Sequence, residues 1–199
     1  MDLSLVAETF CNTPVYWYDT VGQTWLLHDV TCRVPPYDRF ISDRAFGQKK
    51  RIIHTPGGRY LPTTKYLRIG TPEGKIFMVE SVNPDRDEHG EYLNTYMVRE
   101  ATVTVKVLEQ KVVKQASGAK RVTDWEPVAT IWGDLERFGV LRSGELPVDF
   151  TSFTVTLPIE IVLPADCRLE IAGQLYAVTE NFLQLELRQL RVRALNGEP

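Results

Sequence analysis

Hydrophobic and polar residues alternate along several short stretches of the chain. Residues Val103 to Val107 alternate valine with Thr and Lys, and residues Phe153 to Leu157 alternate apolar residues with Thr. A period of two residues is typical of a β-strand with one buried face. Turn-forming residues separate such stretches, for example Thr71 to Gly74 and Ser117 to Gly118. The pattern predicts an all-β protein of many short strands, arranged as a sandwich or as small barrels.

Two stretches depart from this simple alternation. The run from Leu183 to Leu187 alternates leucine with polar residues, but the apolar positions then resume one residue late, at Leu190. We expect a β-bulge near Arg188 and Gln189 to produce this change of phase. The stretch Leu3 to Phe10 contains neither Gly nor Pro and is a candidate for a short helix.

One sequence pattern occurs twice in the same order, about 100 residues apart, which indicates a duplicated domain of common size. Each copy has Leu-Pro, four further residues, Leu-x-Ile, and then a glycine, an aromatic residue and a valine. In the first copy these are Leu61, Pro62, Leu67, Ile69, Gly74, Phe77 and Val79. In the second copy they are Leu163, Pro164, Leu169, Ile171, Gly173, Tyr176 and Val178. Upstream landmarks also recur, namely Trp25 as Trp125, and Asp38-Arg39-Phe40 as Glu136-Arg137-Phe138.

The duplication predicts two tandem small antiparallel β-barrels of about five to six strands each, with long loops. The first would span residues 1–100 and the second residues 101–199. The copies agree in the residues that build the barrels and differ in two segments, a basic connection at 41–60 and an acidic hairpin tip at 83–91. Because function in such folds is carried by loops on a common scaffold, we expect these two segments to contact other molecules.

Composition narrows the class of protein. The chain has 199 residues, of which 43% are hydrophobic and 25% charged, as in an ordinary globular protein rather than a disordered one. Its net charge of −3 gives no overall basic field that would attract nucleic acid or an acidic membrane. No apolar run approaches the roughly 20 residues of a membrane helix, and the first ten residues lack the features of a signal peptide.

Residues that carry chemistry are sparse. The odd number and wide spacing of Cys11, Cys32 and Cys167 favour free thiols in a reducing compartment, with a single disulfide as the alternative. Residues Asp85 to Gly90 resemble the start of a calcium loop, but Tyr96 stands where such a loop has its glutamate, so a polar hairpin tip fits better. No GxSxG, Walker or GxGxxG motif is present, and the three histidines lack metal-ligand spacing. We expect neither an enzyme nor a cofactor or metal site.

Five segments of the second copy together carry a family resemblance. They are Val128 to Trp132, Ser143-Gly144-Glu145, Phe153 to Thr156, Leu163 to Leu169, and Gly173 to Val178. This ordered set resembles the head–tail joining proteins of tailed bacteriophages, also called stopper, head-completion or connector proteins. The resemblance is clearest over residues 125–194, with a divergent second copy in residues 12–100. The first copy departs from the family in its longer basic connection, and in having Pro35-Pro36 where the second has Trp132-Gly133.

The resemblance implies a structural role in a virion. Family proteins form rings below the portal, around the exiting DNA, so a homo-oligomeric ring of six or twelve copies in the neck or tail is implied, assembled in the host cytoplasm. Its partners would be the portal or an adaptor and the tail proteins, with non-specific contact to genomic DNA and none to a membrane. The alternatives in this class are a tail-completion or terminator ring and an adaptor for fibres or spikes.

A nucleic-acid-binding β-barrel is the alternative outside the virion class. Alternate residues of a strand share a face, so Tyr16 and Tyr18 could stack together on the bases of a single strand. Trp17 would then point the other way, into the core. Binding to single-stranded DNA in a gel shift would favour this alternative over the structural one.

Basic residues gather between residues 39 and 68, where eight Lys or Arg stand against one acid, Asp43. Such a segment could contact DNA phosphates, bind an acidic neighbour or simply be solvated. The candidate interface or DNA-channel residues are Arg44, Lys49, Lys50, Arg51 and Arg59. The candidate partner-contact residues are Asp85, Arg86, Asp87, Glu88, His89, Leu141, Arg142 and Glu145.

Overall fold

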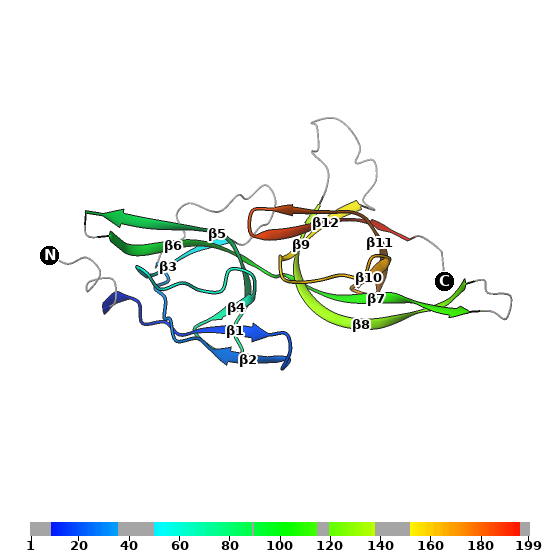
Figure 1. The fold of residues 1–199 in the computed structure, drawn as a ribbon, viewed down its shortest axis with the longest axis horizontal. Helices are drawn as coiled ribbons and strands as arrows, with labels where there is room; N and C mark the ends of the chain where they lie inside the picture. The colour runs from blue at the N-terminus through cyan, green and yellow to red at the C-terminus, as the bar shows by residue number, and fades with distance from the viewer. Residues whose placement is uncertain (1–8, 36–49, 89, 115–119, 138–151, 196–199) are drawn as a thin grey trace, which may run out of the picture. The chain divides into compact units, whose positions relative to one another are not determined.

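The computed structural model describes residues 9–35, 50–88, 90–114, 120–137 and 152–195. These residues form twelve β-strands (Figure 1), and the predicted all-β class is confirmed. The strands are β1 (Val15–Asp19), β2 (Thr24–Leu27), β3 (Lys50–Pro56), β4 (Tyr66–Ile69), β5 (Ile76–Asp87), β6 (Gly90–Glu100), β7 (Val103–Lys114), β8 (Lys120–Arg137), β9 (Ser152–Pro158), β10 (Cys167–Ile171), β11 (Gln174–Gln184) and β12 (Leu187–Ala194). Of the candidate helix Leu3 to Phe10, only Thr9 and Phe10 are described, and both are helical.

The first six strands form one antiparallel sheet in the order β2-β1-β4-β5-β6-β3. Two isolated bridges lie outside this ladder. Cys32 pairs with Thr13, just before β1, and Arg33 pairs with His54 of β3. The segment after β2 therefore reaches the opposite end of the sheet, and the bridges give this unit the character of a barrel.

The last six strands form a closed barrel in the order β10-β11-β12-β9-β8-β7. Read from β8, this order is β8-β7-β10-β11-β12-β9, which is the order of the first unit with each strand number raised by six. The pairs repeat as well, because Leu67 faces Phe77 in the first unit and Leu169 faces Tyr176 in the second. The prediction of two barrel-like units with up to six strands each is confirmed, and the Leu-x-Ile and aromatic-x-valine landmarks stand at matching places.

Alternating apolar residues of the first unit form its core. The cluster consists of Val15, Val30, Cys32, Ile53, Leu61, Leu67, Phe77, Val79, Tyr96 and Val98. Phe77 and Val79, the repeated aromatic-x-valine pair, both point into it. Full burial of a large apolar side chain stabilises a fold by about 1.5–3 kcal/mol, so this pattern accounts for much of the unit's stability.

Contacts divide the chain into two compact units. The first contains the residues up to Ala101 together with Leu157–Glu160 and Leu183–Arg188. The second contains Thr102–Thr156, Ile161–Phe182 and the residues from Gln189 onward. The main break in the sequence thus falls between Ala101 and Thr102, directly after β6.

A tight turn interrupts the leucine run that precedes the change of phase. Leu185 and Glu186 form the turn between β11 and β12, and Leu185 has a φ of 53°, in the left-handed region. The leucine run therefore crosses from one strand to the next, and Leu183 and Leu185 are exposed while Leu187 is buried. Within β12, Leu187, Leu190 and Val192 are all buried, so the phase changes between Leu187 and Leu190, after this turn. The bulge near Arg188 and Gln189 stays a prediction.

The basic connection predicted at residues 41–60 contains strand β3, which pairs with β6 over seven residues. The prediction that this whole segment is irregular is wrong, because Ile53 and Thr55 are buried and the intervening residues face outward. The hairpin predicted at 83–91 is confirmed, but its tip is shorter. Strand pairing continues to Asp87 and Gly90, so most of the segment belongs to the ladder.

Candidate contact surfaces

The segment after β3, residues 57–61, is held in place by a buried amide. The Nδ2 group of Asn94 on β6 donates to the carbonyl oxygens of Pro56 at 3.2 Å and of Arg59 at 3.0 Å. The hydroxyl of Thr55 donates to the same Arg59 carbonyl at 2.7 Å. Asn94 and Thr55 are both 0% exposed, so the carbonyl groups of an otherwise irregular segment are satisfied without water.

Two further contacts fix the 57–61 segment against β6. The backbone N–H of Gly57 donates to the carbonyl of Tyr92 at 3.0 Å, and the N–H of Leu61 donates to the hydroxyl of Tyr96 at 3.0 Å. A Cβ atom on Gly57 would lie 2.0 Å from the carbonyl oxygen of Glu91. Only glycine permits so close an approach, and the segment is consequently a rigid support for the side chains that project from it.

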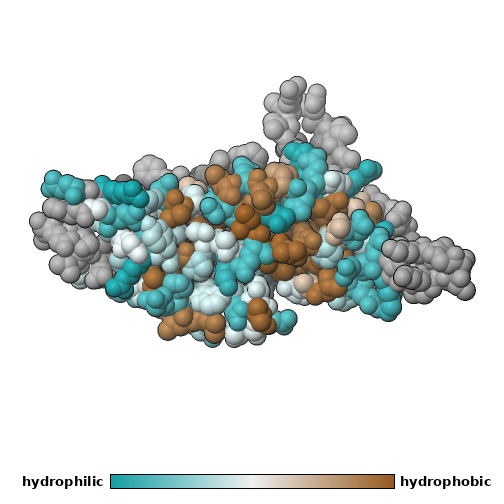
Figure 2. Space-filling model, in the orientation of Figure 1, coloured by the Kyte–Doolittle hydropathy of each residue, from teal (hydrophilic) through white to brown (hydrophobic). Residues whose placement is uncertain are grey.

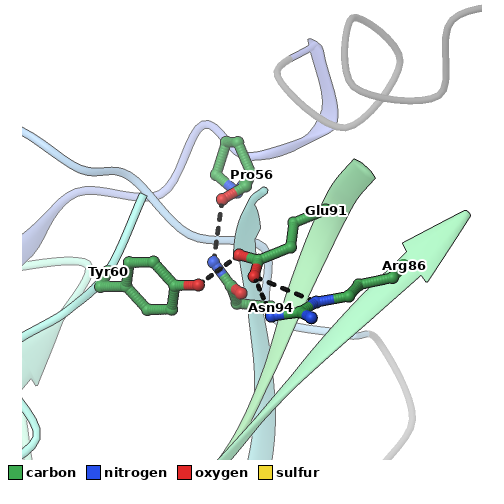
Figure 3. A network of polar contacts seen from close by, with 5 residues as sticks. All are labelled: Pro56, Tyr60, Arg86, Glu91 and Asn94. Atoms are coloured by element: carbon green, nitrogen blue, oxygen red, sulfur yellow. Dashed lines mark hydrogen bonds and ion pairs between the residues drawn. The ribbon is translucent and has the colours of Figure 1, made fainter. Parts of the chain in front are cut away.

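Tyr60, Arg86 and Glu91 form a polar network on this support (Figure 3). The hydroxyl of Tyr60 donates to one oxygen of the Glu91 carboxylate, and Arg86 donates to the other from Nη2 at 2.7 Å and from Nε at 3.2 Å. These hydrogen bonds, Tyr60 first and Arg86 second, lower the pKa of the Glu91 carboxyl, and the same bond to Glu91 raises the pKa of Tyr60. The network ties the 57–61 segment to the β5–β6 hairpin.

This arrangement brings together residues that the sequence placed in two separate loops. Arg59 lies in the basic connection and Arg86 in the hairpin, and both are exposed. Tyr60, the residue after Arg59, is joined to Arg86 through the carboxylate of Glu91. Tyr60, which the sequence did not single out, is 47% exposed. Exposed Tyr and Arg side chains on a rigid backbone are typical of the residues that dominate protein interfaces.

Asp85 is engaged inside the hairpin. The hydroxyl of Thr95 donates to the Asp85 carboxylate at 2.9 Å, and the same hydroxyl oxygen lies 3.1 Å from Nδ1 of His54. Because a hydroxyl has one hydrogen, His54 must donate from Nδ1. Burial lowers the pKa of His54, the nearby Arg33 lowers it further, and Asp85 opposes both effects. Asp85 therefore accepts a hydrogen bond within the hairpin, and through Thr95 it helps to orient His54 of β3.

Lys50 lies at the start of β3, where it forms part of an ion cluster. Its Nζ is 2.9 Å from Oε1 of Glu80, and Nη2 of Arg99 is 3.2 Å from the same oxygen. Glu80 is the extra residue of a β-bulge, since Val79 and Ser81 occupy consecutive rungs of the ladder with β6. Arg99 is 4% exposed, so this cluster is structural, and the prediction that Lys50 lies in a loop is wrong.

Arg51 also belongs to β3 and not to a loop. Its guanidinium lies 5.7 Å from the ring centre of Phe77. Both Arg51 and Phe77 line a cavity of about 330 Å³, together with Thr13, Val34, Ile69 and Lys75. Lys75 forms an ion pair with Glu100 at 2.9 Å, which offsets one of the two positive charges at the cavity.

Several candidate residues have no structural account. Arg44, Lys49, His89, Leu141, Arg142 and Glu145 lie outside the described residues. Asp87 ends β5 and pairs with Gly90, and Glu88 is exposed in the turn that follows it. Among the sequence candidates, Arg59, Arg86 and Glu88 are thus the ones that the structure places on an exposed surface.

Sequence reasoning did not identify an aromatic cluster on the face of β1, β2 and β4 opposite the core, where Tyr66 is 2% exposed. The rings of Tyr18 and Trp25 are 5.2 Å apart, Tyr18 also contacts Tyr66 edge-on, and the Arg68 guanidinium lies 4.1 Å over Trp25. The alternation predicted for Tyr16 to Tyr18 is confirmed, because Trp17 packs on the core. Tyr18 of β1 meets Trp25 of β2 and Tyr66 of β4, so only the pairing of these strands could reveal the cluster.

The second unit has a comparable pair. Arg168 of β10 lies 4.3 Å over the ring of Trp125 on β8. In both units the arginine and the tryptophan flank a central strand, and their partners on that strand are two residues apart. Cation–π contacts of this kind contribute about 0.5–1 kcal/mol at exposed sites. The pairs therefore stabilise the outer faces of both sheets.

The His, Cys, Asp and Glu residues of the described part of the chain form no metal-binding cluster. No group of three or more His, Cys, Asp or Glu residues there could hold a metal ion. Burial raises the pKa of the Cys32 thiol to about 12 and also raises the pKa of Cys11, so neither is a thiolate at neutral pH. No helix among the described residues is long and apolar enough to cross a membrane.

Comparisons of the chain with family models, with curated proteins and with solved structures each found no match. The geometry defines the class of protein as two tandem six-stranded barrel-like units, the second of which is a closed barrel. A functional assignment has to be built from these surfaces and from the sequence resemblance of residues 125–194.

Proposed function

We propose that this chain is a structural protein of a tailed-bacteriophage virion. It forms a ring in the neck that joins the portal or an adaptor to the tail around the DNA channel. The observation that carries the proposal is the tandem pair of units with one strand order, the second of which is a closed barrel. Residues 125–194, which resemble head–tail joining proteins, form most of that barrel.

The contact surface of the first unit supports a connecting role. Arg59 and Tyr60 are exposed on a segment whose backbone is held by hydrogen bonds from Thr55 and Asn94. Exposed Arg86 is joined to Tyr60 through Glu91. A rigid surface loses little conformational entropy on binding, which suits a protein that has to stack on a neighbouring ring. The polar character of this surface suits contacts that form in water from preassembled parts.

Loss of the gene tests the proposal in the phage that encodes the chain. A neck connector predicts DNA-filled heads and separate, finished tails that do not join, seen by electron microscopy. Tails of abnormal length would instead indicate a tail terminator, and complete particles without fibres an adaptor for fibres or spikes. Normal infectious particles would overturn the structural role altogether.

Charge reversal of exposed arginines tests the contact surface. Arg59→Glu combined with Arg86→Glu is expected to lower the yield of joined particles by at least roughly tenfold, because rim and hot-spot charges direct docking. Arg193→Glu, at an exposed position of β12, is the matched control. Equal yields from the two variants would show that the surface formed by Arg59 and Arg86 does not dock.

A nucleic-acid-binding barrel is the second candidate function, favoured by the aromatic face of Tyr18, Trp25 and Arg68. Stacking of a base on an aromatic side chain contributes about 1–3 kcal/mol. If this candidate is correct, the chain binds single-stranded DNA at moderate salt and Trp25→Ala weakens binding at least roughly fivefold. The absence of a shifted band with a single-stranded oligonucleotide would exclude it.

A further inference from the structure

Strand β2 is an edge strand whose side chains are unusually apolar for its position. Among the described residues it pairs only with β1, and its outer side has no partner strand (Figure 1). Leu26 is 39% exposed and Leu27 is 64% exposed. Hydrophobic surface is visible along the margin of the molecule that β2 forms (Figure 2). Exposed apolar edge strands are templates for pairing with another chain.

The backbone phase of β2 is fixed by hydrogen bonds on both sides of β1. The N–H of His28 donates to the carbonyl of Val15, and the N–H of Gly70 on the β4 side donates to Pro14. In an antiparallel ladder, bonded and non-bonded pairs alternate along the strands. Because Trp25 faces Tyr18 and Leu27 faces Tyr16, Trp25 and Leu27 occupy the non-bonded positions. Their N–H and C=O groups therefore point outward, away from β1.

The equivalent strand of the second unit is protected at its exposed edge. Residues 126–130 of β8 are all exposed, and they include Glu126 and Pro127. The ladder with β7 skips Val128 there, which makes a bulge. Charged residues, proline and bulges are the devices by which proteins prevent edge pairing. Strand β2 has the sequence Thr-Trp-Leu-Leu in an unbroken register and contains none of the three.

We propose that the outer edge of β2 pairs antiparallel with β2 of a second copy of this chain. A two-fold pairing places each strand opposite itself, which is unfavourable where charges meet like charges. The four residues of β2 carry no charge, so self-pairing has no such cost. Trp25 would face Leu27 of the second copy and Leu26 would face itself, so that the outward groups of Trp25 and Leu27 would complete a continuous sheet.

The contact is short and predicts a weak dimer. Four residues on each side bury less than a standard interface of about 1,600 Å², so we expect dissociation constants of roughly 10–500 µM. This pairing closes on itself and cannot propagate around a ring. It is a property of the free chain, separate from the proposed connector function, and either can hold if the other fails.

Sedimentation equilibrium of the full chain from about 5 to 500 µM tests the pairing. The wild type is expected to form dimers, and Leu27→Lys is expected to weaken them at least tenfold. Leu27→Pro removes an outward N–H without breaking a bond to β1, and should have the same effect. Val162→Lys, at an apolar position that is 85% exposed in the second unit, is the matched control and should leave the dimer unchanged.

Amide hydrogen exchange distinguishes strand pairing from non-specific association. The amides of Trp25 and Leu27 should gain protection as the concentration of the chain rises. Circular dichroism checks that each variant is folded, and Leu27→Lys, which changes an exposed side chain, suffices if the proline variant is not. A wild type that is monomeric at every concentration overturns the proposal. Dimers that resist both Leu27 variants, or that only Val162→Lys disrupts, overturn it as well.

Discussion

Asn94 illustrates how a single buried polar side chain can organise an exposed surface. It is 0% exposed, and its amide group donates to two carbonyl oxygens of the segment that carries Arg59 and Tyr60. A buried carbonyl left without a donor costs free energy. Because the irregular segment does not form the internal hydrogen bonds of a helix or strand, its carbonyls need a donor from elsewhere. The position of the exposed residues Arg59 and Tyr60 is therefore fixed by a side chain that is itself buried.

Asn94→Ala should lower the free energy of unfolding by about 1–3 kcal/mol, because the carbonyl of Pro56 loses its side-chain donor in a buried setting. Urea denaturation measures the effect. Asn12→Ala, at an exposed asparagine of the same unit, should change stability by less than about 0.5 kcal/mol. Equal effects from both substitutions would contradict the role given to Asn94.

The environment of His54 predicts a dependence of stability on pH. Burial lowers its pKa from the ordinary 6.5, the positive charge of Arg33 lowers it further, and Asp85 opposes the change. The unfolded chain then binds a proton at this histidine more readily than the folded chain. Stability is fully present above pH 6.5 and is lost as the pH falls through the lowered pKa of the folded state.

The measurement is the free energy of unfolding between about pH 7 and pH 5.5, above the range in which carboxylates titrate. The wild type should lose stability over this range, and His54→Gln should flatten the dependence. A His28→Gln variant controls for the loss of a histidine as such. A wild-type slope that persists in His54→Gln would assign the effect to other groups.

At the scale of elements, the 57–61 segment approaches the backbone of β6 closely at Gly57. A Cβ on Gly57 would lie 2.0 Å from the Glu91 carbonyl oxygen and 2.7 Å from the backbone nitrogen of Tyr92. Neither backbone atom can move without disturbing the β5–β6 ladder. Gly58, the next residue, has open space around it but a φ of +71°.

Gly57→Ala should therefore cost about 3 kcal/mol, at the upper end of the range for overpacking. Gly58→Ala should cost about 1–2 kcal/mol, the strain of a left-handed conformation. Denaturant unfolding of the two variants separates the cost of space from the cost of backbone angle. A smaller loss in Gly57→Ala than in Gly58→Ala would mean that the segment shifts freely away from β6.

Strand β3 shows why one element was missed in the sequence. Its residues include Lys50, Arg51 and His54, and this density of polar residues resembles a loop. The repeat held the missing signal, since the alternation at Phe153 to Leu157 marks β9, and β3 occupies the matching place in the strand order. Polar residues are tolerated in β3 because Glu80 on β5 and Thr95 on the neighbouring strand β6 bind them.

At the scale of the whole molecule, the repeated order of strands implies repeated energetics. Leu67 and Leu169 occupy equivalent positions, each opposite the aromatic residue of the returning strand, and both are 0% exposed. Truncation of either leucine leaves a cavity among residues that cannot fully relax. The two units should depend on these residues to a similar degree.

Leu67→Ala and Leu169→Ala should each lower the stability of their own unit by about 2–5 kcal/mol. Amide hydrogen exchange resolves the two units and locates each loss. Leu183→Ala, at a leucine that is 58% exposed, is the control and should cost less than about 0.5 kcal/mol. A loss confined to one of the two buried leucines would show that the units, despite their common order, distribute their stability differently.

The sequence by itself determined the β class, the two-fold repeat and the strands that bury one face. These follow from local alternation and from landmarks such as Leu-Pro and aromatic-x-valine, which depend on near neighbours along the chain. It also indicated the β5–β6 hairpin, because turn-forming residues stand between two apolar runs. The boundaries failed at β3 and at Leu185, where polar residues lie in a strand and apolar residues lie in a turn.

Only the tertiary structure decided which polar and aromatic residues meet. The network of Tyr60, Arg86 and Glu91 and the face of Tyr18, Trp25 and Arg68 each join segments far apart in the sequence. The edge position of β2, which pairs only with β1 among the described strands, likewise depends on the arrangement of distant segments. The physical reason is that a strand's hydrogen-bonding partners and its cross-strand neighbours are set by register between distant segments, which local alternation does not encode.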